Sequence, residues 1–139
     1  MHLKISYSEI NAFIRKNIRQ PLQVSYGYDK KINIKYTYKT NVFLIGDIEK
    51  DISISLSVYY VYSDKVIFQA DSGAIVKMFL PAVLNSVANK NQLNFLSASG
   101  DKITLDISKI EGAASILNMA SLNSIDISNV GVDVQVTLK

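Results

Sequence analysis

Alternating apolar and polar residues predict β-strands over much of the chain. In residues 32–39, Ile and Tyr alternate with Asn, Lys and Thr, and residues 52–60 and 65–70 repeat this period of two. Turn-forming pairs separate these stretches, Gly46-Asp47 before the second and Ser63-Asp64 before the third. Such short gaps do not allow parallel crossovers, so we expect an antiparallel β-meander.

Two stretches instead show the spacing of three and four that is typical of helices. The first covers residues 7–19. It follows a capping box of Ser6 and Glu9 and stops before Pro21; its apolar stripe is Ile10, Phe13, Ile14 and Ile18. The second covers residues 73–89 and is apolar over a wider arc, with Pro81 near its middle. We expect this second helix to be enclosed and kinked.

The last third of the chain returns to strands. Residues 93–96 and 103–107 flank a turn at Ser99-Gly100-Asp101, residues 112–120 form a short helix of small residues, and residues 125–127 and 130–138 form a closing pair. The 139 residues suffice for one core and one domain, residues 1–139. The predicted fold class is α+β, a strongly bent antiparallel β-meander wrapped around one long apolar helix, with short peripheral helices.

The composition removes several kinds of chemistry. The chain has no Cys and one His, His2, so it offers no thiolate nucleophile, Cys-based zinc site or multi-histidine site. It also lacks a Gly-rich phosphate loop and a nucleophile elbow. Asp47, Glu49 and Asp51 are spaced to share one face of an extended chain, where they could bind calcium, but we expect a solvated acidic turn between two strands and no metal site. We predict no enzymatic activity and no cofactor.

Charge and aromatic residues bear on partners and location. The net charge is +3, and residues 1–50 carry nine Lys and Arg against four acids. The eight tyrosines could stack on nucleic-acid bases, but in residues 32–39 Tyr and Lys lie on opposite faces, so we do not expect nucleic-acid binding. No apolar run is long enough to span a bilayer, and residues 1–10 do not resemble a signal peptide. These features predict a cytoplasmic protein, unless a leader has been removed.

The predicted sheet and enclosed helix together suggest a ligand site. A curled sheet that does not close fully on a helix leaves an apolar groove, which suits a lipid or another small apolar ligand. We expect the groove to be lined by Leu56, Val58, Tyr60 and Phe68 of the sheet and by Ile75, Phe79, Leu80, Val83 and Leu84 of helix 73–89. The same side chains can instead form a dry core, and periodicity does not separate the two.

The alternative function is a protein–protein interaction or assembly component without a ligand. Residues 130–138 alternate regularly, and as an edge strand they would offer unpaired backbone groups to a partner.

The order of elements resembles that of single-domain bacterial tubular lipid-binding (TULIP) proteins. Three segments carry the resemblance: YSEINAFIRKNI at residues 7–18, ITLDISKI at 103–110 and LNSIDISNVGVDVQVTLK at 122–139. The resemblance implies a bent sheet around a long helix and a lipid in the groove between them. It also allows an assembly role, because some small members accompany proteins of the same fold, for instance beside clostridial toxins. The Lys-, Asn- and Ile-rich composition suggests a bacterial origin.

Overall fold

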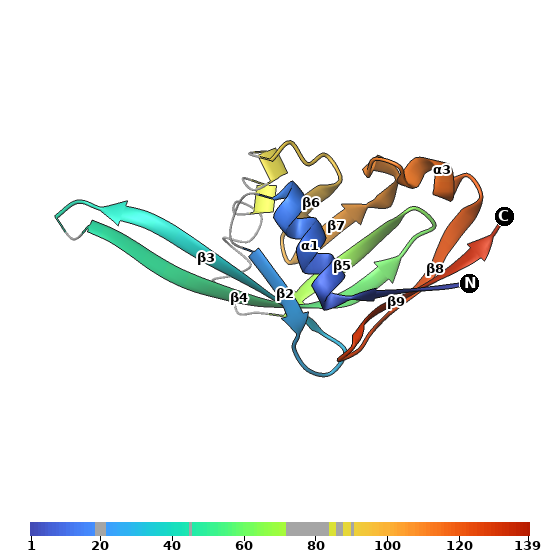
Figure 1. The fold of residues 1–139 in the computed structure, drawn as a ribbon, viewed down its shortest axis with the longest axis horizontal. Coiled ribbons are helices and arrows are strands. Elements are labelled where there is room, and N and C mark those ends of the chain that lie inside the picture. The colour runs from blue at the N-terminus through green and yellow to red at the C-terminus, as the bar shows by residue number, and fades with distance from the viewer. Residues whose placement is uncertain (19–21, 45, 72–83, 86–87, 90) are drawn as a thin grey trace.

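The computed structural model describes residues 1–18, 22–44, 46–71, 84–85, 88–89 and 91–139. Two antiparallel sheets make up most of this part of the chain (Figure 1). The larger sheet has the strand order β2-β3-β4-β5-β7-β6, and the smaller sheet has the order β1-β9-β8.

The larger sheet contains the meander that the sequence predicts. Its strands are β2 (Leu22–Tyr26), β3 (Ile32–Val42), β4 (Gly46–Val61), β5 (Lys65–Asp71), β6 (Leu96–Ser99) and β7 (Lys102–Asp106). All neighbouring strands run antiparallel, which confirms the predicted pairing.

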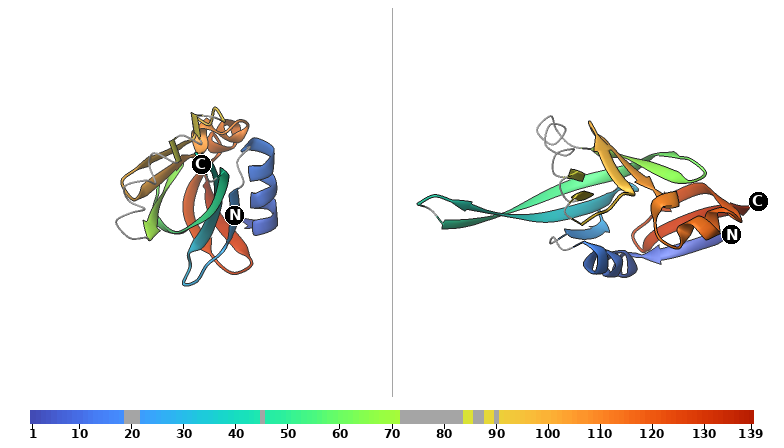
Figure 2. Two further views of the ribbon diagram at one scale, coloured as in Figure 1. Left: turned by 90° about the vertical axis from the view of Figure 1, so that its left-hand side faces the viewer. Right: turned by 90° about the horizontal axis from the view of Figure 1, so that it is seen from above.

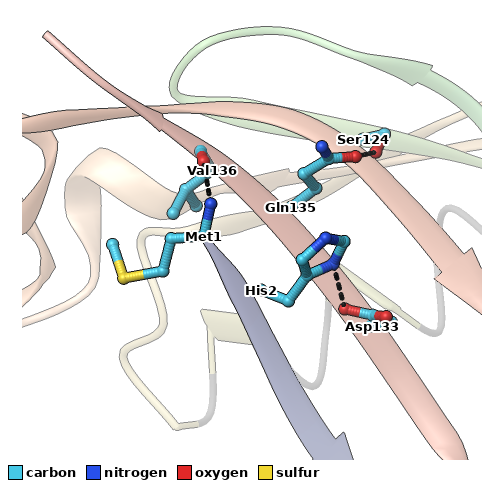
Figure 3. A network of polar contacts seen from close by, with 6 residues as sticks. All are labelled: Met1, His2, Ser124, Asp133, Gln135 and Val136. Carbon is cyan, nitrogen blue, oxygen red and sulfur yellow. Dashed lines mark hydrogen bonds and ion pairs between the residues drawn. The ribbon is translucent and has the colours of Figure 1, made fainter.

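The smaller sheet joins the two ends of the chain. Strand β9 (Gly131–Leu138) lies between β1 (His2–Ser6) and β8 (Ala120–Ile127). The Met1 ammonium group donates to the Val136 carbonyl over 3.2 Å, and His2 Nδ1 lies 3.1 Å from Asp133 Oδ1 (Figure 3). At Gly131, β1 approaches so closely that a Cβ atom would lie 2.3 Å from the Ile5 carbonyl oxygen, so this position requires glycine.

Helix α1 (Tyr7–Asn17) covers one end of the larger sheet. It begins with the predicted capping box, in which Ser6 Oγ accepts from the Glu9 amide and the Glu9 carboxylate accepts from the Ser6 amide. Ile14 and Ile18 are buried against Val24 of β2, and half-buried residues such as Ile34 and Tyr36 of β3 extend this cluster. Phe13, which the sequence placed on the same stripe, is exposed.

A second cluster of buried residues lies under the middle of the sheet. Strands β4, β5 and β7 each supply one buried side chain, namely Leu56, Ala70 and Ile103. Phe68 and Leu84 pack against them, together with Ile32, Ile34, Ile54, Leu96 and Ala98.

The predicted fold class is wrong. The described residues form two sheets instead of one bent meander, and they include no long apolar helix. Their α-helices with defined bounds are α1 and the five-residue α3 (Ala113–Leu117), and η1 (Ile107–Lys109) is one 3-10 turn. Most of predicted helix 73–89 lies outside the described residues. The second sheet was missed because β1 pairs with β9 across almost the whole chain, a contact that local periodicity does not report.

An asparagine side chain covers the middle of each edge strand of the larger sheet. On β2, the Val24 amide donates to Asn11 Oδ1 over 2.7 Å and Asn11 Nδ2 donates to the Val24 carbonyl over 2.8 Å. On β6, the Ala98 amide and carbonyl make the same two contacts with Asn85, at 3.3 Å and 3.4 Å. Both edges are therefore protected against pairing with another strand at these positions.

We expect Asn11→Ala to lower the free energy of unfolding by about 1–3 kcal/mol, because it leaves the partly buried amide and carbonyl of Val24 without partners. The matched control is Asn17→Ala, which removes an exposed bond to the Phe13 carbonyl and should change stability by about 0.5 kcal/mol or less. Urea unfolding followed by circular dichroism measures both values. Equal effects of the two variants would show that Asn11 does not protect this edge.

Candidate interaction surfaces

Strands β3 and β4 extend beyond the rest of the larger sheet as a two-stranded arm. Strand β2 pairs with β3 as far as Tyr36, and β5 pairs with β4 only from Ser55 onward. Residues 37–44 and 46–54 therefore form a hairpin that projects from the body (Figures 1 and 2). We call these residues the arm; its nine β4 positions correspond to about 30 Å of strand.

The tip of the arm exposes large apolar side chains. Phe43 is 86% exposed and Leu44 is 91% exposed. Leu44 also has a φ of +74°, a conformation that favours Gly or Asn and costs a bulky residue on the order of 1–3 kcal/mol. A leucine that is both strained and exposed contributes little to the fold of this chain, which favours a role for its side chain in binding.

Both edges of the arm are open, since no strand in the described part of the chain pairs with them. An isolated two-stranded hairpin is marginally stable in water, and open edges invite another strand. The two edges differ in charge: residues 46–54 of β4 contain Asp47, Glu49, Lys50 and Asp51, whereas residues 37–42 of β3 contain Lys39 alone.

A cluster of exposed tyrosines lies at the opposite end of β4. The register of β4 against β5 shifts between Val58 and Tyr60, so Val58 pairs with Phe68 while Tyr60 pairs with Ile67. This β-bulge moves Tyr60 to the face opposite the core. Tyr59, Tyr60 and Tyr62 are all exposed there, and the Tyr60 and Tyr62 rings lie 4.7 Å apart.

Two lysines already contact this tyrosine cluster. Lys102 Nζ lies 4.4 Å from the Tyr59 ring centroid, and Lys65 Nζ lies 5.0 Å from that of Tyr62. Lys102 is also paired with Asp101 over 3.0 Å. Aromatic residues and cations thus share one face, as stacking on nucleic-acid bases requires. However, Lys65 and Lys102 already contact two of the rings, and the charge of Lys102 is paired with Asp101, which does not favour nucleic-acid binding here.

The structure separates the residues that the sequence assigned to one groove. Leu56, Phe68 and Leu84 meet in the buried cluster under the sheet, Val58 is half-buried, and Tyr60 is exposed on the other face. The placement of Tyr60 was wrong because the bulge changes which residues share a face. Ile75, Phe79, Leu80 and Val83 lie outside the described residues.

The predicted edge strand at residues 130–138 was also wrong. Strand β9 has a neighbour on each side, β1 and β8, so its backbone groups are not available to a partner.

Three acidic positions, Asp47, Glu49 and Asp51, were considered for calcium. Asp47 is exposed on the arm, and the side chains of Glu49 and Asp51 lie outside the described part.

Neither a metal centre nor a membrane span emerges within the described ranges. No group of three or more His, Asp or Glu side chains there could hold a metal ion, and no helix there is long and apolar enough to cross a bilayer.

Burial raises the pKa of Tyr7, and nearby Tyr26 adds to the shift. The Tyr7 hydroxyl donates to the Ser128 carbonyl over 2.6 Å, so it links α1 to the smaller sheet and serves a structural role.

Sequence reasoning missed the arm tip, although its signal was present. The run of Val42, Phe43, Leu44 and Ile45 stands where the strand pattern requires a turn, and turns are normally polar. The tyrosine cluster had no comparable signal, because the bulge that creates it has no reliable sequence signature.

Comparison of the chain with protein-family models, with curated proteins and with solved structures finds no match. The resemblance to TULIP proteins therefore rests on the sequence pattern alone.

Leu56 and Tyr60 provide a test of this arrangement, because the sequence assigned both to one groove. We expect Leu56→Ala to destabilise the fold by about 2–5 kcal/mol, since it leaves a cavity in the buried cluster. Tyr60→Ala should cost less than about 1 kcal/mol, because that ring is exposed. Equilibrium unfolding in guanidinium chloride measures both; similar losses would mean that Tyr60 is buried and that the bulge is not present in solution.

Proposed function

We propose that this protein is a non-enzymatic assembly component that binds another protein chain through its arm. The observation that carries this proposal is the exposure of Phe43 and Leu44 at the tip of a projecting two-stranded hairpin. Burying large apolar side chains provides most of the binding energy at protein interfaces, and aromatic residues are enriched there.

Three further features support binding to protein. The open edges of the arm suit strand addition, which supplies affinity through backbone hydrogen bonds. Asparagine side chains cover the middle of β2 and of β6, whereas no strand in the described part of the chain covers the edges of the arm over several residues. The arm also combines acidic and basic residues with no excess of cations, which does not favour an anionic membrane surface.

Lipid carriage remains a prediction from the sequence. Three of its nine proposed lining residues, Leu56, Phe68 and Leu84, pack together in a buried cluster, which favours a dry core at that point. We therefore place the assembly function first.

Cysteine labelling at the tip tests the assembly function, because a single introduced cysteine is unique in this chain. We expect Leu44→Cys to react with a maleimide at least tenfold more slowly in an extract of the producing cells than in the purified, dilute protein, since a bound chain covers the tip. Val130→Cys is the matched control: Val130 is also apolar and 78% exposed, but it lies in the turn between β8 and β9. Equal rates at position 44 in both samples would contradict the proposal.

Native mass spectrometry separates assembly from lipid carriage. We expect the purified wild-type protein to show masses of the polypeptide and its multiples, with no adduct of lipid mass. A lipid that is released on denaturation and recovered by solvent extraction would instead support the groove and make carriage the primary function.

A further inference from the structure

The direction of the backbone groups along β3 follows from the cap on β2. The amide and carbonyl of Val24 point to Asn11, away from β3, so Val24 and Ile34 form a non-hydrogen-bonded pair. In an antiparallel ladder this orientation alternates from residue to residue. The register of β3 has no irregularity, so the amides and carbonyls of Lys39 and Asn41 point to the open edge of the arm.

Charge decides which open edge can pair with a second copy of the chain. In a two-fold antiparallel pairing, the positions directly opposite each other lie on the same face of the sheet. Asp47, Glu49 and Asp51 share one face of β4, so pairing of two β4 edges brings acidic positions of one copy opposite acidic positions of the other. Like charges directly opposite are destabilising, so β4 is protected against its own copy. The open edge of β3 contains one charged position, Lys39, and residues with high strand propensity, such as Tyr38, Thr40 and Val42.

We propose that the arms of two copies pair along β3, around a two-fold axis at Thr40, and form a homodimer. In this register Lys39 of one copy lies opposite Asn41 of the other, and the two residues exchange backbone hydrogen bonds. This register therefore sets no lysine position opposite another lysine position. The proposal rests on the arm being the interaction surface, as in the proposed function, and it names the partner.

The same register accounts for the apolar tip. It sets Phe43 of one copy opposite Thr37 of the other, at the root of the arm, next to the pair formed by Leu22 and Tyr36. The tip of each copy thus reaches the partner's β2 near Leu22, and the two marginal hairpins become one four-stranded sheet, β4-β3-β3-β4. The acidic β4 edges end on the outside, which limits the assembly to a closed dimer, the commonest symmetric form.

Disulfide trapping tests the axis directly in this cysteine-free chain. At a non-hydrogen-bonded pair the two Cα atoms at position 40 are about 4.5 Å apart, within reach of a disulfide. We therefore expect Thr40→Cys to form a covalent dimer as the main product of mild oxidation, seen on a non-reducing gel. Ile48→Cys is the matched control, because Ile48 lies directly opposite Thr40 on β4. Its two copies are three strand spacings apart, about 14 Å, and should not link.

A second pair of variants tests the backbone hydrogen bonds. Asn41→Pro removes an amide that points outward, so the hairpin keeps its internal ladder, whereas Asn41→Ala keeps the amide. We expect wild type and Asn41→Ala to sediment as a concentration-dependent dimer, and Asn41→Pro to raise the dissociation constant at least tenfold with an unchanged circular dichroism spectrum.

The outcomes distinguish the partner from the function. A wild-type protein that stays monomeric, or equal cross-linking of Thr40→Cys and Ile48→Cys, overturns the homodimer. If Leu44→Cys is nevertheless protected in extract, the partner is a different protein and the assembly function stands. If Leu44→Cys is not protected and no dimer forms, both proposals fail.

Discussion

Strand β4 is longer than the sheet that holds it, and the rest of the structure depends on this mismatch. Of its 16 residues, Ser55 and Leu56 have a partner strand on each side, and residues 57–61 pair with β5. Residues 46–54 pair with β3 alone within the described part of the chain. Leu56 contributes to the core, and residues 46–54 form half of the arm. One continuous strand therefore anchors the body and carries the most exposed apolar residues of the described chain away from it.

The two ends of β4 present different surfaces because the strand is interrupted by the bulge between Val58 and Tyr60. Before the bulge, Leu56 and Val58 face inward with Ala70 and Phe68; after it, Val61 pairs with the buried Val66 and Tyr60 turns outward. The asparagine caps act on the two edge strands of the larger sheet, at Val24 of β2 and Ala98 of β6. Pairing with another chain is thus hindered at these two positions of the larger sheet and left open along the arm.

Local rules predicted local structure well. The Ser6 and Glu9 capping box, the antiparallel pairing of β3 with β4 and the turn at Gly100 follow from short-range chemistry, and the structure contains all three. The turn predicted at Gly46-Asp47 was wrong, because both residues pair with β3 as the start of β4. What could not be predicted depends on distant or irregular contacts. The second sheet arises from pairing of β1 with β9, β9 is central because β8 also reaches it, and Tyr60 changes face through a bulge. Among the described groove residues, Tyr60 was misplaced for the same reason, since a single irregularity reverses the inward and outward positions that follow it.

Translation produces β1 well before β9, its partner strand in the described part of the chain. The five residues of β1 pair with Gly131 to Gln135 of β9, which are translated after every strand of the larger sheet. The meander of β2 to β5 can form from neighbouring segments before then. Strand β1 therefore lacks this partner until β9 has been made, and closure of the smaller sheet is a later step than formation of the meander.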